Sequence, residues 1–158
     1  MFHGKFLLSH RKRALFSINK HPISKTFAAR ILILTDVNKS LPSILIIEPD
    51  RRTLELYERA LAQDFQVFGA IDEKQALFIL GQKKLDAVVL EPAGLGGRGW
   101  SLLTSIKSIS NLQGIPVILC TILDQRQRGI EMGAAVYLTK PVLPTALQQV
   151  LHKILSIT

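Results

Sequence analysis

The stretch at residues 85–91 reads Leu85-Asp86-Ala87-Val88-Val89-Leu90-Glu91 and leads into a proline- and glycine-rich segment at residues 92–99. A short, mostly apolar run of this kind is typical of a buried strand that ends in a loop. Buried strands that are apolar on both faces belong to parallel sheets covered by helices. Functional residues of such sheets lie where the strands end, and Glu91 is the first residue beyond this strand. An acid at that place can bind a metal, accept a phosphoryl group or pair with a cation.

Apolar runs of similar length predict four more strands, at residues 43–48, 65–70, 116–121 and 136–139. Helical patterns separate the strands. The helices are predicted to begin after Asp50 and after Asp72, to cover residues 100–109 and about 124–132, and to begin at Pro144. Gly81 and Gly133 are the expected stop signals of the second and fourth helices.

Five strands that alternate with five helices predict an α/β fold, a three-layer sandwich with a five-stranded parallel sheet. One common strand order for such a sheet is 2-1-3-4-5. This order would place the ends of the first and third strands side by side, and Glu48, Asp50 and Glu91 would gather there. The sequence therefore predicts an acidic pocket at the carboxyl edge of the sheet.

Charge is unevenly distributed over the 158 residues, whose net charge is +8. Residues 1–40 hold eight Lys or Arg and one acid, whereas residues 41–158 hold twelve Lys or Arg and eleven acids. We therefore expect a basic, disordered extension at residues 1–42 and a nearly neutral folded domain at residues 43–158. The single cysteine, Cys120, excludes an internal disulfide, and no apolar run is long enough for a membrane span, so we expect a cytoplasmic protein.

The basic extension allows other interpretations as well. An acid-poor start rich in Arg and Ser resembles an organelle transit peptide, and a start codon placed too far upstream would have the same appearance. The extension could also bind nucleic acid or a membrane surface, an interaction that salt would weaken steeply. Deleting residues 1–40 should leave the melting temperature of the remainder nearly unchanged, because an aperiodic segment contributes little to a core.

Several local patterns predict packing or loop structure rather than chemistry. Residues 94–99 spell G-x-G-x-x-G, but three residues separate them from their strand and no acid ends the next strand, so we interpret them as a loop and not as a dinucleotide site. Trp100 and Cys120 are predicted to be packing residues. Four histidines lack the spacing of metal ligands: His3, His10, His21 and His152.

Residues 43–157 resemble response-regulator receiver domains, which have a flavodoxin-like fold. The resemblance rests on the four strand-end runs, of which the most specific is the last: Ile44-Leu45-Ile46-Ile47-Glu48-Pro49-Asp50, residues 85–91, Pro116-Val117-Ile118-Leu119-Cys120-Thr121, and Gly133-Ala134-Ala135-Val136-Tyr137-Leu138-Thr139-Lys140-Pro141. It implies signal transduction in a two-component system, with a histidine kinase or an output protein as the partner. In the family an Asp after the third strand accepts phosphate and an acid pair after the first strand helps hold Mg²⁺. Thr121 matches the hydroxyl that contacts the phosphate, Lys140 the lysine and Tyr137 the switch aromatic, and Lys140-Pro141 matches a peptide that is cis in the family.

Two positions depart from the receiver pattern. Glu91 stands where the family has its phosphoacceptor Asp and is one methylene longer. Glu48 and Pro49 stand where the family has its acid pair, and Pro49 has no side-chain oxygen for a hard cation, so we expect weak Mg²⁺ binding at most and no other cofactor. Asp50 lies one position along and is expected to cap the helix that follows. The fourth helix is also about one turn shorter than in the usual receiver, which does not favour the dimer mode that many receivers use.

These departures predict a degenerate receiver, or pseudo-receiver: a signalling module without enzymatic activity that acts through protein–protein contacts and without phosphorylation. We expect a direct ion pair between Glu91 and Lys140, with Thr121 donating a hydrogen bond to the same carboxylate. Two alternatives remain open here. The chain could be a working receiver that uses Glu91 or a displaced acid, and Lys140 could be solvated beside a Glu91 that only caps the loop.

Overall fold

A computed structural model of the chain describes residues 40–156, which lie within one compact unit, Ser40–Thr158. The interpretations of residues 1–39 therefore fall outside the described residues. Five parallel strands form one sheet in the order β2-β1-β3-β4-β5, which confirms the predicted topology. The strands are β1 (Ser43–Ile47), β2 (Gln66–Ala70), β3 (Ala87–Leu90), β4 (Val117–Thr121) and β5 (Val136–Thr139).

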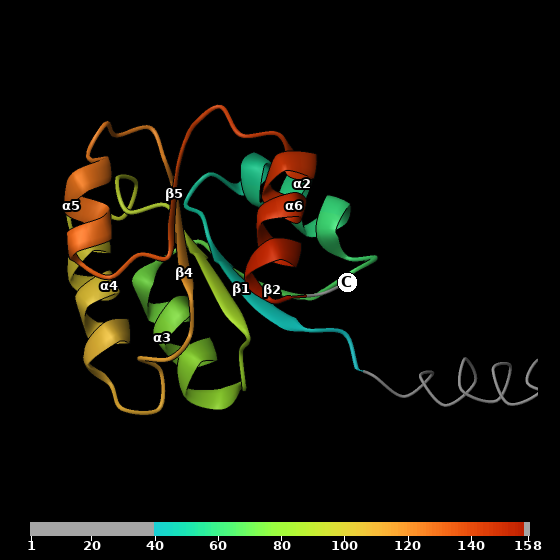
Figure 1. Ribbon diagram of the computed structural model, residues 1–158, viewed down its shortest axis with the longest axis horizontal. Coiled ribbons are helices and arrows are strands. Elements are labelled where there is room, and N and C mark those ends of the chain that lie inside the picture. The colour runs from blue at the N-terminus through green and yellow to red at the C-terminus, as the bar shows by residue number, and fades with distance from the viewer. Residues whose placement is uncertain (1–39, 157–158) are drawn as a thin grey trace, which may run out of the picture. The chain divides into compact units, whose positions relative to one another are not determined.

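Five helices cover the two faces of this sheet, as Figure 1 shows. On one face lie α2 and α6, and on the other lie α3, α4 and α5. The helices are α2 (Arg51–Leu61), α3 (Glu73–Gln82), α4 (Gly99–Ser108), α5 (Arg126–Glu131) and α6 (Pro144–Ile154). None of the helices within residues 40–156 is long and apolar enough to cross a membrane.

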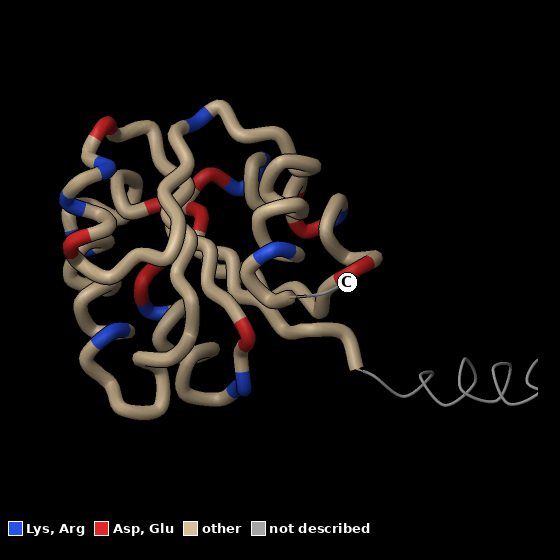
Figure 2. The backbone as a smooth tube through the Cα atoms, viewed as in Figure 1, with Lys and Arg blue, Asp and Glu red and all other residues tan. Residues whose placement is uncertain are grey.

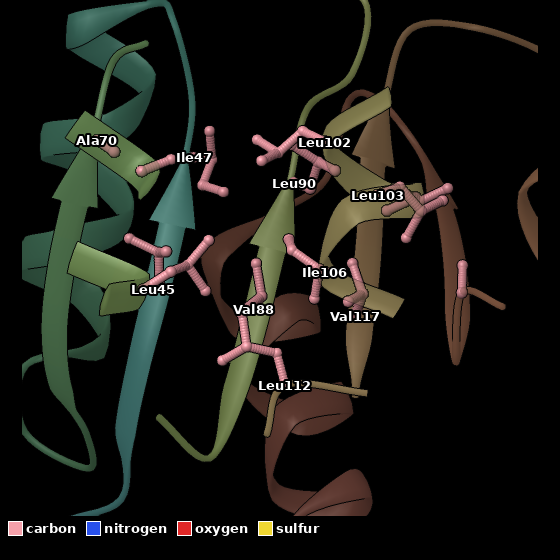
Figure 3. Close-up of a cluster of buried hydrophobic side chains, with 14 of the residues drawn as sticks. Leu45, Ile47, Ala70, Val88, Leu90, Leu102, Leu103, Ile106, Leu112 and Val117 are labelled. Carbon is pink, nitrogen blue, oxygen red and sulfur yellow. The ribbon is translucent and has the colours of Figure 1, made fainter. Parts of the chain in front are cut away.

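The core consists of two apolar layers, one on each face of the sheet. Residues of β1, β3 and β4 are buried on both faces, as expected for central parallel strands. Figure 3 shows the layer between the sheet and α4, where Leu102, Leu103 and Ile106 pack against β3 and β4. This burial fixes the ends of the central strands, and those ends carry the polar residues described below.

The helices begin and end within one residue of the positions predicted from sequence, except at the start of α5. Asp50 and Asp72 cap α2 and α3 by accepting hydrogen bonds from Thr53 N and Gln75 N, both at 2.8 Å. The predicted end near Gly81 holds to within one residue, but Gly81 itself is helical and α3 ends at Gln82. The strand predicted from residue 85 begins at Ala87, and the helix predicted over about 124–132 covers only Arg126–Glu131.

Helix α5 is anchored by aromatic contacts instead of an apolar stripe, and its only buried residue is Gly129. A Cβ at Gly129 would lie 2.7 Å from the ring of Tyr137, so the glycine lets the helix backbone approach this ring. The guanidinium of Arg128 lies 4.5 Å from the ring centroid of Trp100, which belongs to α4. This geometry is that of a cation–π contact. After the helix, Gly133 has a positive φ of 91°, which confirms it as the predicted stop.

Candidate functional site

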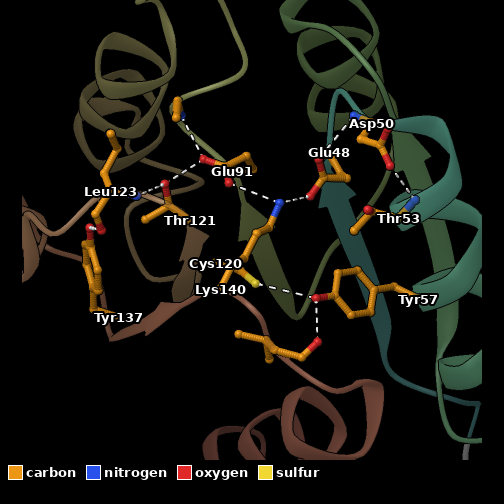
Figure 4. A network of polar contacts seen from close by, with 12 residues as sticks. Glu48, Asp50, Thr53, Tyr57, Glu91, Cys120, Thr121, Leu123, Tyr137 and Lys140 are labelled. Atoms are coloured by element: carbon orange, nitrogen blue, oxygen red, sulfur yellow. Dashed lines mark hydrogen bonds and ion pairs between the residues drawn. The ribbon is translucent and has the colours of Figure 1, made fainter.

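The polar residues at the carboxyl edge come from four neighbouring strands. Glu48 follows β1, Glu91 follows β3, Thr121 ends β4 and Lys140 follows β5. Figure 4 shows the lysine ammonium between the two carboxylates, with the threonine hydroxyl on the far side of Glu91. Residues that lie up to 92 positions apart in the sequence are thus brought into direct contact.

Lys140 bridges both glutamates. Its Nζ lies 2.5 Å from Glu48 Oε2 and 3.0 Å from Glu91 Oε2. Both glutamates are buried, with exposed fractions of 4% and 5%, and the lysine side chain is 17% exposed. Burial by itself would lower the pKa of Lys140, but its hydrogen bonds to Glu48 and Glu91 and their negative charges raise it above the usual lysine value. The ammonium is therefore charged throughout the neutral range.

The remaining oxygens of the two carboxylates also have donors. Glu91 Oε1 accepts from the Thr121 hydroxyl at 2.6 Å and from Ala93 N at 2.8 Å, and Glu48 Oε1 accepts from Asp50 N at 3.1 Å. Within residues 40–156 every buried side-chain nitrogen or oxygen has a hydrogen-bond partner. The predicted ion pair and the predicted threonine hydrogen bond are confirmed. The alternative was a Glu91 that caps the loop beside a solvated Lys140. Glu91 does accept a hydrogen bond from Ala93 in its loop, but Lys140 is bound to both glutamates and is not solvated.

The charges of this pocket do not balance. Two carboxylates face one ammonium, so the buried group carries one net negative charge when all three are ionised. Charged hydrogen bonds from Thr121 and from the backbone donors of Ala93 and Asp50 stabilise the excess. Lys140 is consequently the one cation on which both carboxylates depend within the described part of the chain.

Asp50 stands apart from this group. It is exposed and directs its carboxylate to Thr53 N at the start of α2, where the hydrogen bonds from Thr53 lower its pKa. The expected capping role is confirmed, and the gathering of Asp50 with the two glutamates is wrong for its side chain. Only its backbone N reaches Glu48, because the short carboxylate is committed to the first turn of the helix.

The pocket does not fit Mg²⁺, the ion that receivers hold at this edge. A hard cation needs several free oxygen ligands in near-octahedral geometry. Here both carboxylates already bind an ammonium, and the neighbouring position is Pro49, whose ring lies against the loop after β3. A Cβ at Gly94 would lie 2.8 Å from that ring, so proline and loop are in close contact. The described residues contain no group of three His, Cys, Asp or Glu side chains arranged for a metal ion.

Tyr137 connects the pocket region to the loop before α5. Its ring is buried, with 1% exposure, and its hydroxyl donates to Leu123 O at 2.6 Å and accepts from Gln125 N at 3.0 Å. Leu123 N in turn donates to the Thr121 hydroxyl at 3.2 Å. A continuous set of hydrogen bonds therefore runs from Glu91 through Thr121 and this loop to Tyr137. The peptide Lys140-Pro141 is cis, as the receiver resemblance implies.

The other residues considered from sequence lie outside the pocket. Trp100 is buried against α5 and Cys120 is buried in β4, where burial raises the pKa of the thiol. His152 contacts Asp64 Oδ2 at 2.9 Å and belongs to no metal-like cluster among the described residues, and the other histidines precede those residues. In the glycine-rich loop, Gly96 and Gly97 adopt positive φ, as befits a turn.

Sequence reasoning missed the contact between Lys140 and Glu48. The available signal was the strand order, which placed Glu48 beside Glu91 and within reach of any long cation from β5. The prediction paired the lysine with one glutamate only, because receivers pair it with their acceptor. Glu48 is one methylene longer than an aspartate at that position, and its carboxylate reaches the same ammonium.

Comparisons with known proteins identify the same family that the sequence resembles. The family model described as "Response regulator receiver domain" matches residues 44–152. The transcriptional regulatory protein PrrA of Mycobacterium leprae is 33% identical over 110 residues, which cover 67% of this chain and 46% of that protein. The response regulator PleD of Caulobacter vibrioides is 31% identical over 118 residues, 73% of this chain and 23% of PleD.

Solved structures match the fold. A response regulator receiver domain protein (CheY-like) from Methanospirillum hungatei has a TM-score of 0.68 at 21% identity, covering 74% of this chain and 95% of that one. The response regulator DrrB of Thermotoga maritima has a TM-score of 0.64 at 25% identity, covering 74% of this chain and 54% of DrrB. The chain spans less than half the length of the curated relatives it matches.

Proposed function

This chain belongs to the response regulator receiver family, and we propose that within the family it is a pseudo-receiver whose pocket is held in one state by Glu91 and Lys140. Its function is then to present a receiver surface to a protein partner, a histidine kinase or an output protein, without a phosphorylation cycle. The pocket performs no catalytic turnover in this proposal.

The observation that carries the proposal is the complete engagement of the Glu91 carboxylate. A phosphoacceptor must present a free carboxylate oxygen to the phosphorus atom of a donor. Both oxygens of Glu91 already accept hydrogen bonds or an ion pair, from Thr121, Ala93 and Lys140, and the residue is 5% exposed. The two side chains that would hold a phosphoryl group in a receiver are thus bound to the carboxylate itself.

The added methylene of Glu91 supports this interpretation. An aspartate at the same backbone position would end one carbon earlier and extend its carboxylate less far into the pocket. The longer side chain reaches Thr121 and Lys140 directly, and therefore satisfies the hydroxyl and the ammonium with no phosphate bound. The pocket is in this sense permanently occupied by a residue of the chain.

A phosphotransfer experiment tests the proposal. The full chain is incubated with acetyl phosphate and Mg²⁺, and intact mass spectrometry measures any added phosphoryl group. We expect no adduct on the wild type. The double variant Glu91→Asp/Pro49→Asp restores both receiver positions and is expected to gain one. Phosphorylation of the wild type that Glu91→Gln abolishes would contradict the proposal, and phosphorylation that Asp50→Asn abolishes would support a displaced acceptor.

A calorimetric titration with Mg²⁺ tests the same pocket independently of phosphorylation. With Pro49 in the pocket and Lys140 on both carboxylates, we expect no saturable binding up to about 1 mM, because a hard cation would have to displace the ammonium. The double variant Glu91→Asp/Pro49→Asp serves as the matched positive control. A clear sub-millimolar site in the wild type would be incompatible with a pocket closed by the lysine.

A further inference from the structure

Tyr57 of α2 carries a hydroxyl group into a largely apolar layer of the core. The residue is 3% exposed and belongs to the buried cluster beneath α2 and α6, together with Leu54, Leu61 and Leu147. A phenylalanine would fill the same space, so packing alone does not account for the hydroxyl. A buried hydroxyl costs free energy unless it has a hydrogen-bond partner. The partner of this hydroxyl therefore indicates what the residue contributes.

The hydroxyl binds the main chain just beyond Lys140. It donates to Val142 O at 2.9 Å and lies 3.8 Å from Cys120 Sγ, as the dashed lines from Tyr57 in Figure 4 show. Burial raises the pKa of Tyr57, and the negative charges of the two pocket carboxylates act in the same direction. The hydroxyl therefore keeps its proton and remains a donor throughout the neutral range.

The loop between β5 and α6 has few other attachments. Lys140 N donates to Thr121 O at 2.8 Å, whereas Pro141 has no N–H to donate. Helix α6 begins without a side-chain cap. Among the described residues, the hydrogen bond from Tyr57 is the only one that joins residues 141–143 to an element other than α6. The main chain around Lys140 is thus held at two points, by β4 before the loop and by α2 within it.

We propose that Tyr57 is a positioning residue for Lys140. Its hydroxyl fixes the loop after β5, and the fixed loop directs the lysine side chain, which is only 17% exposed, toward the two carboxylates. Pro141 and Leu143 lie at the surface, so a loop without this hydrogen bond would be free to move outward and carry the ammonium with it. The closed state of the pocket then depends on α2 as well as on the residues of the pocket itself.

This inference rests on the proposed function, because it concerns what keeps Lys140 in the closed pocket. The two are nevertheless separable. A Lys140 that reacts in the wild type as freely as an exposed lysine would contradict the closed pocket itself. A Lys140 that is protected in the wild type and stays equally protected in Tyr57→Phe would contradict only the role of Tyr57.

Competitive acetylation of the full chain measures how well the ammonium is held. The chain is treated with a trace of acetic anhydride at mildly alkaline pH, and peptide mass spectrometry gives the rate at each lysine. Only an amine that has left the carboxylates and lost a proton reacts, so the rate at Lys140 follows the population of the open loop. We expect Lys140 of the wild type to react more slowly than Lys153, which is exposed on α6. Tyr57→Phe should raise the rate at Lys140 about two- to tenfold, the change in an equilibrium that one neutral hydrogen bond produces.

Two controls separate positioning from a general loosening of the fold. Lys107 is partly buried and donates to Ile115 O at 2.7 Å, just before β4 begins, so its rate should stay constant in Tyr57→Phe. Tyr137→Phe removes the other buried tyrosine hydroxyl, which also donates to a main-chain oxygen but in the loop before α5. Tyr137→Phe should lower stability in urea as Tyr57→Phe does, and should leave the rate at Lys140 unchanged.

Cys120→Ala tests the second neighbour of the hydroxyl. It removes the thiol and leaves the hydrogen bond to Val142 O in place, so the rate at Lys140 should match the wild type. Three results would overturn the proposal: no increase at Lys140 in Tyr57→Phe, an equal increase at Lys107, or an increase of the same size in Tyr137→Phe or Cys120→Ala.

Discussion

Replacement of Lys140 by methionine tests how the pocket holds its charges. Methionine keeps most of the volume of the side chain and removes the ammonium that lies 2.5 Å from Glu48 and 3.0 Å from Glu91. Two buried carboxylates then face each other without a cation, and the net charge of the group changes from −1 to −2. Removing one partner of a buried pair costs about 3–5 kcal/mol, because the remaining charge is left uncompensated. We expect Lys140→Met to lie in this range.

Glu91→Gln should cost much less than Lys140→Met. It leaves one carboxylate with one ammonium, which is a neutral pair, and the amide can still accept from Thr121. We expect a loss of about 1–2 kcal/mol, the value of weakened hydrogen bonds to charged groups. The order of the two losses in stability is therefore the most informative prediction. A simple count of contacts would predict the reverse order, because Lys140 makes two polar contacts and Glu91 makes three.

Urea denaturation followed by circular dichroism at pH 7 measures both losses. The m value should stay constant, so that the shift of the midpoint reports stability alone. Lys153→Met, at an exposed position of α6, is the control and should stay within about 0.5 kcal/mol of the wild type. The reasoning is refuted if Lys140→Met costs less than about 1 kcal/mol, or if Glu91→Gln costs as much.

The pH dependence follows from the direction of the Lys140 pKa. Its neighbours raise this pKa above the ordinary lysine value, so its contribution is fully present below that value and is lost as the pH rises through the folded pKa. The stability from this group should therefore be constant through the neutral range and fall only in strong alkali.

Three further substitutions and one deletion have expected outcomes. Thr121→Val keeps the shape of the side chain but removes the hydroxyl that donates to the buried carboxylate, and should cost about 1.5–3 kcal/mol in urea denaturation. Gly129→Ala should lower stability by about 1–3 kcal/mol, because its Cβ would lie 2.7 Å from the Tyr137 ring, whereas Gly81→Ala, in open space on a helix, should raise it by about 0.5–1 kcal/mol. Equal signs for the two glycine variants would contradict the packing described at α5. Deletion of residues 1–40 should leave the melting temperature within about 5 °C, roughly one kcal/mol, of the full chain. A larger drop in calorimetry would contradict the expectation that these residues contribute little to the core.

The fold could be predicted because its strands are buried on both faces. A strand such as Val117–Thr121 has no polar side to interrupt it, so it stands out as an apolar run bounded by turn residues. Helix ends were predicted less accurately. A glycine such as Gly81 often follows the last residue of a helix, but it can also lie within the last turn, so it does not fix the end by itself. In the structure Gly81 stays helical, and the chain leaves the helix at Lys83 in an extended conformation.

The pocket could be predicted in part. Strand order alone brings Glu91, Thr121 and Lys140 to one edge, and their lengths allow contact. The sharing of Lys140 by Glu48 depends on the direction of a long flexible side chain, which local sequence does not determine. The contact of Pro49 with Gly94 depends on the course of a glycine-rich loop, and such loops have no periodic pattern to reveal their path.

The contact between Arg128 and Trp100 makes the fluorescence of this tryptophan sensitive to the position of α5. Trp100 is the only tryptophan of the chain, and its ring lies 4.5 Å from a guanidinium on α5. An indole senses a nearby positive charge in the wavelength and the yield of its emission. Because α5 is short and buries only Gly129, it can separate locally at a lower free energy than the whole domain unfolds. Emission from Trp100 would then change before the circular dichroism of the sheet, so a single unlabelled sample distinguishes release of one helix from loss of the fold.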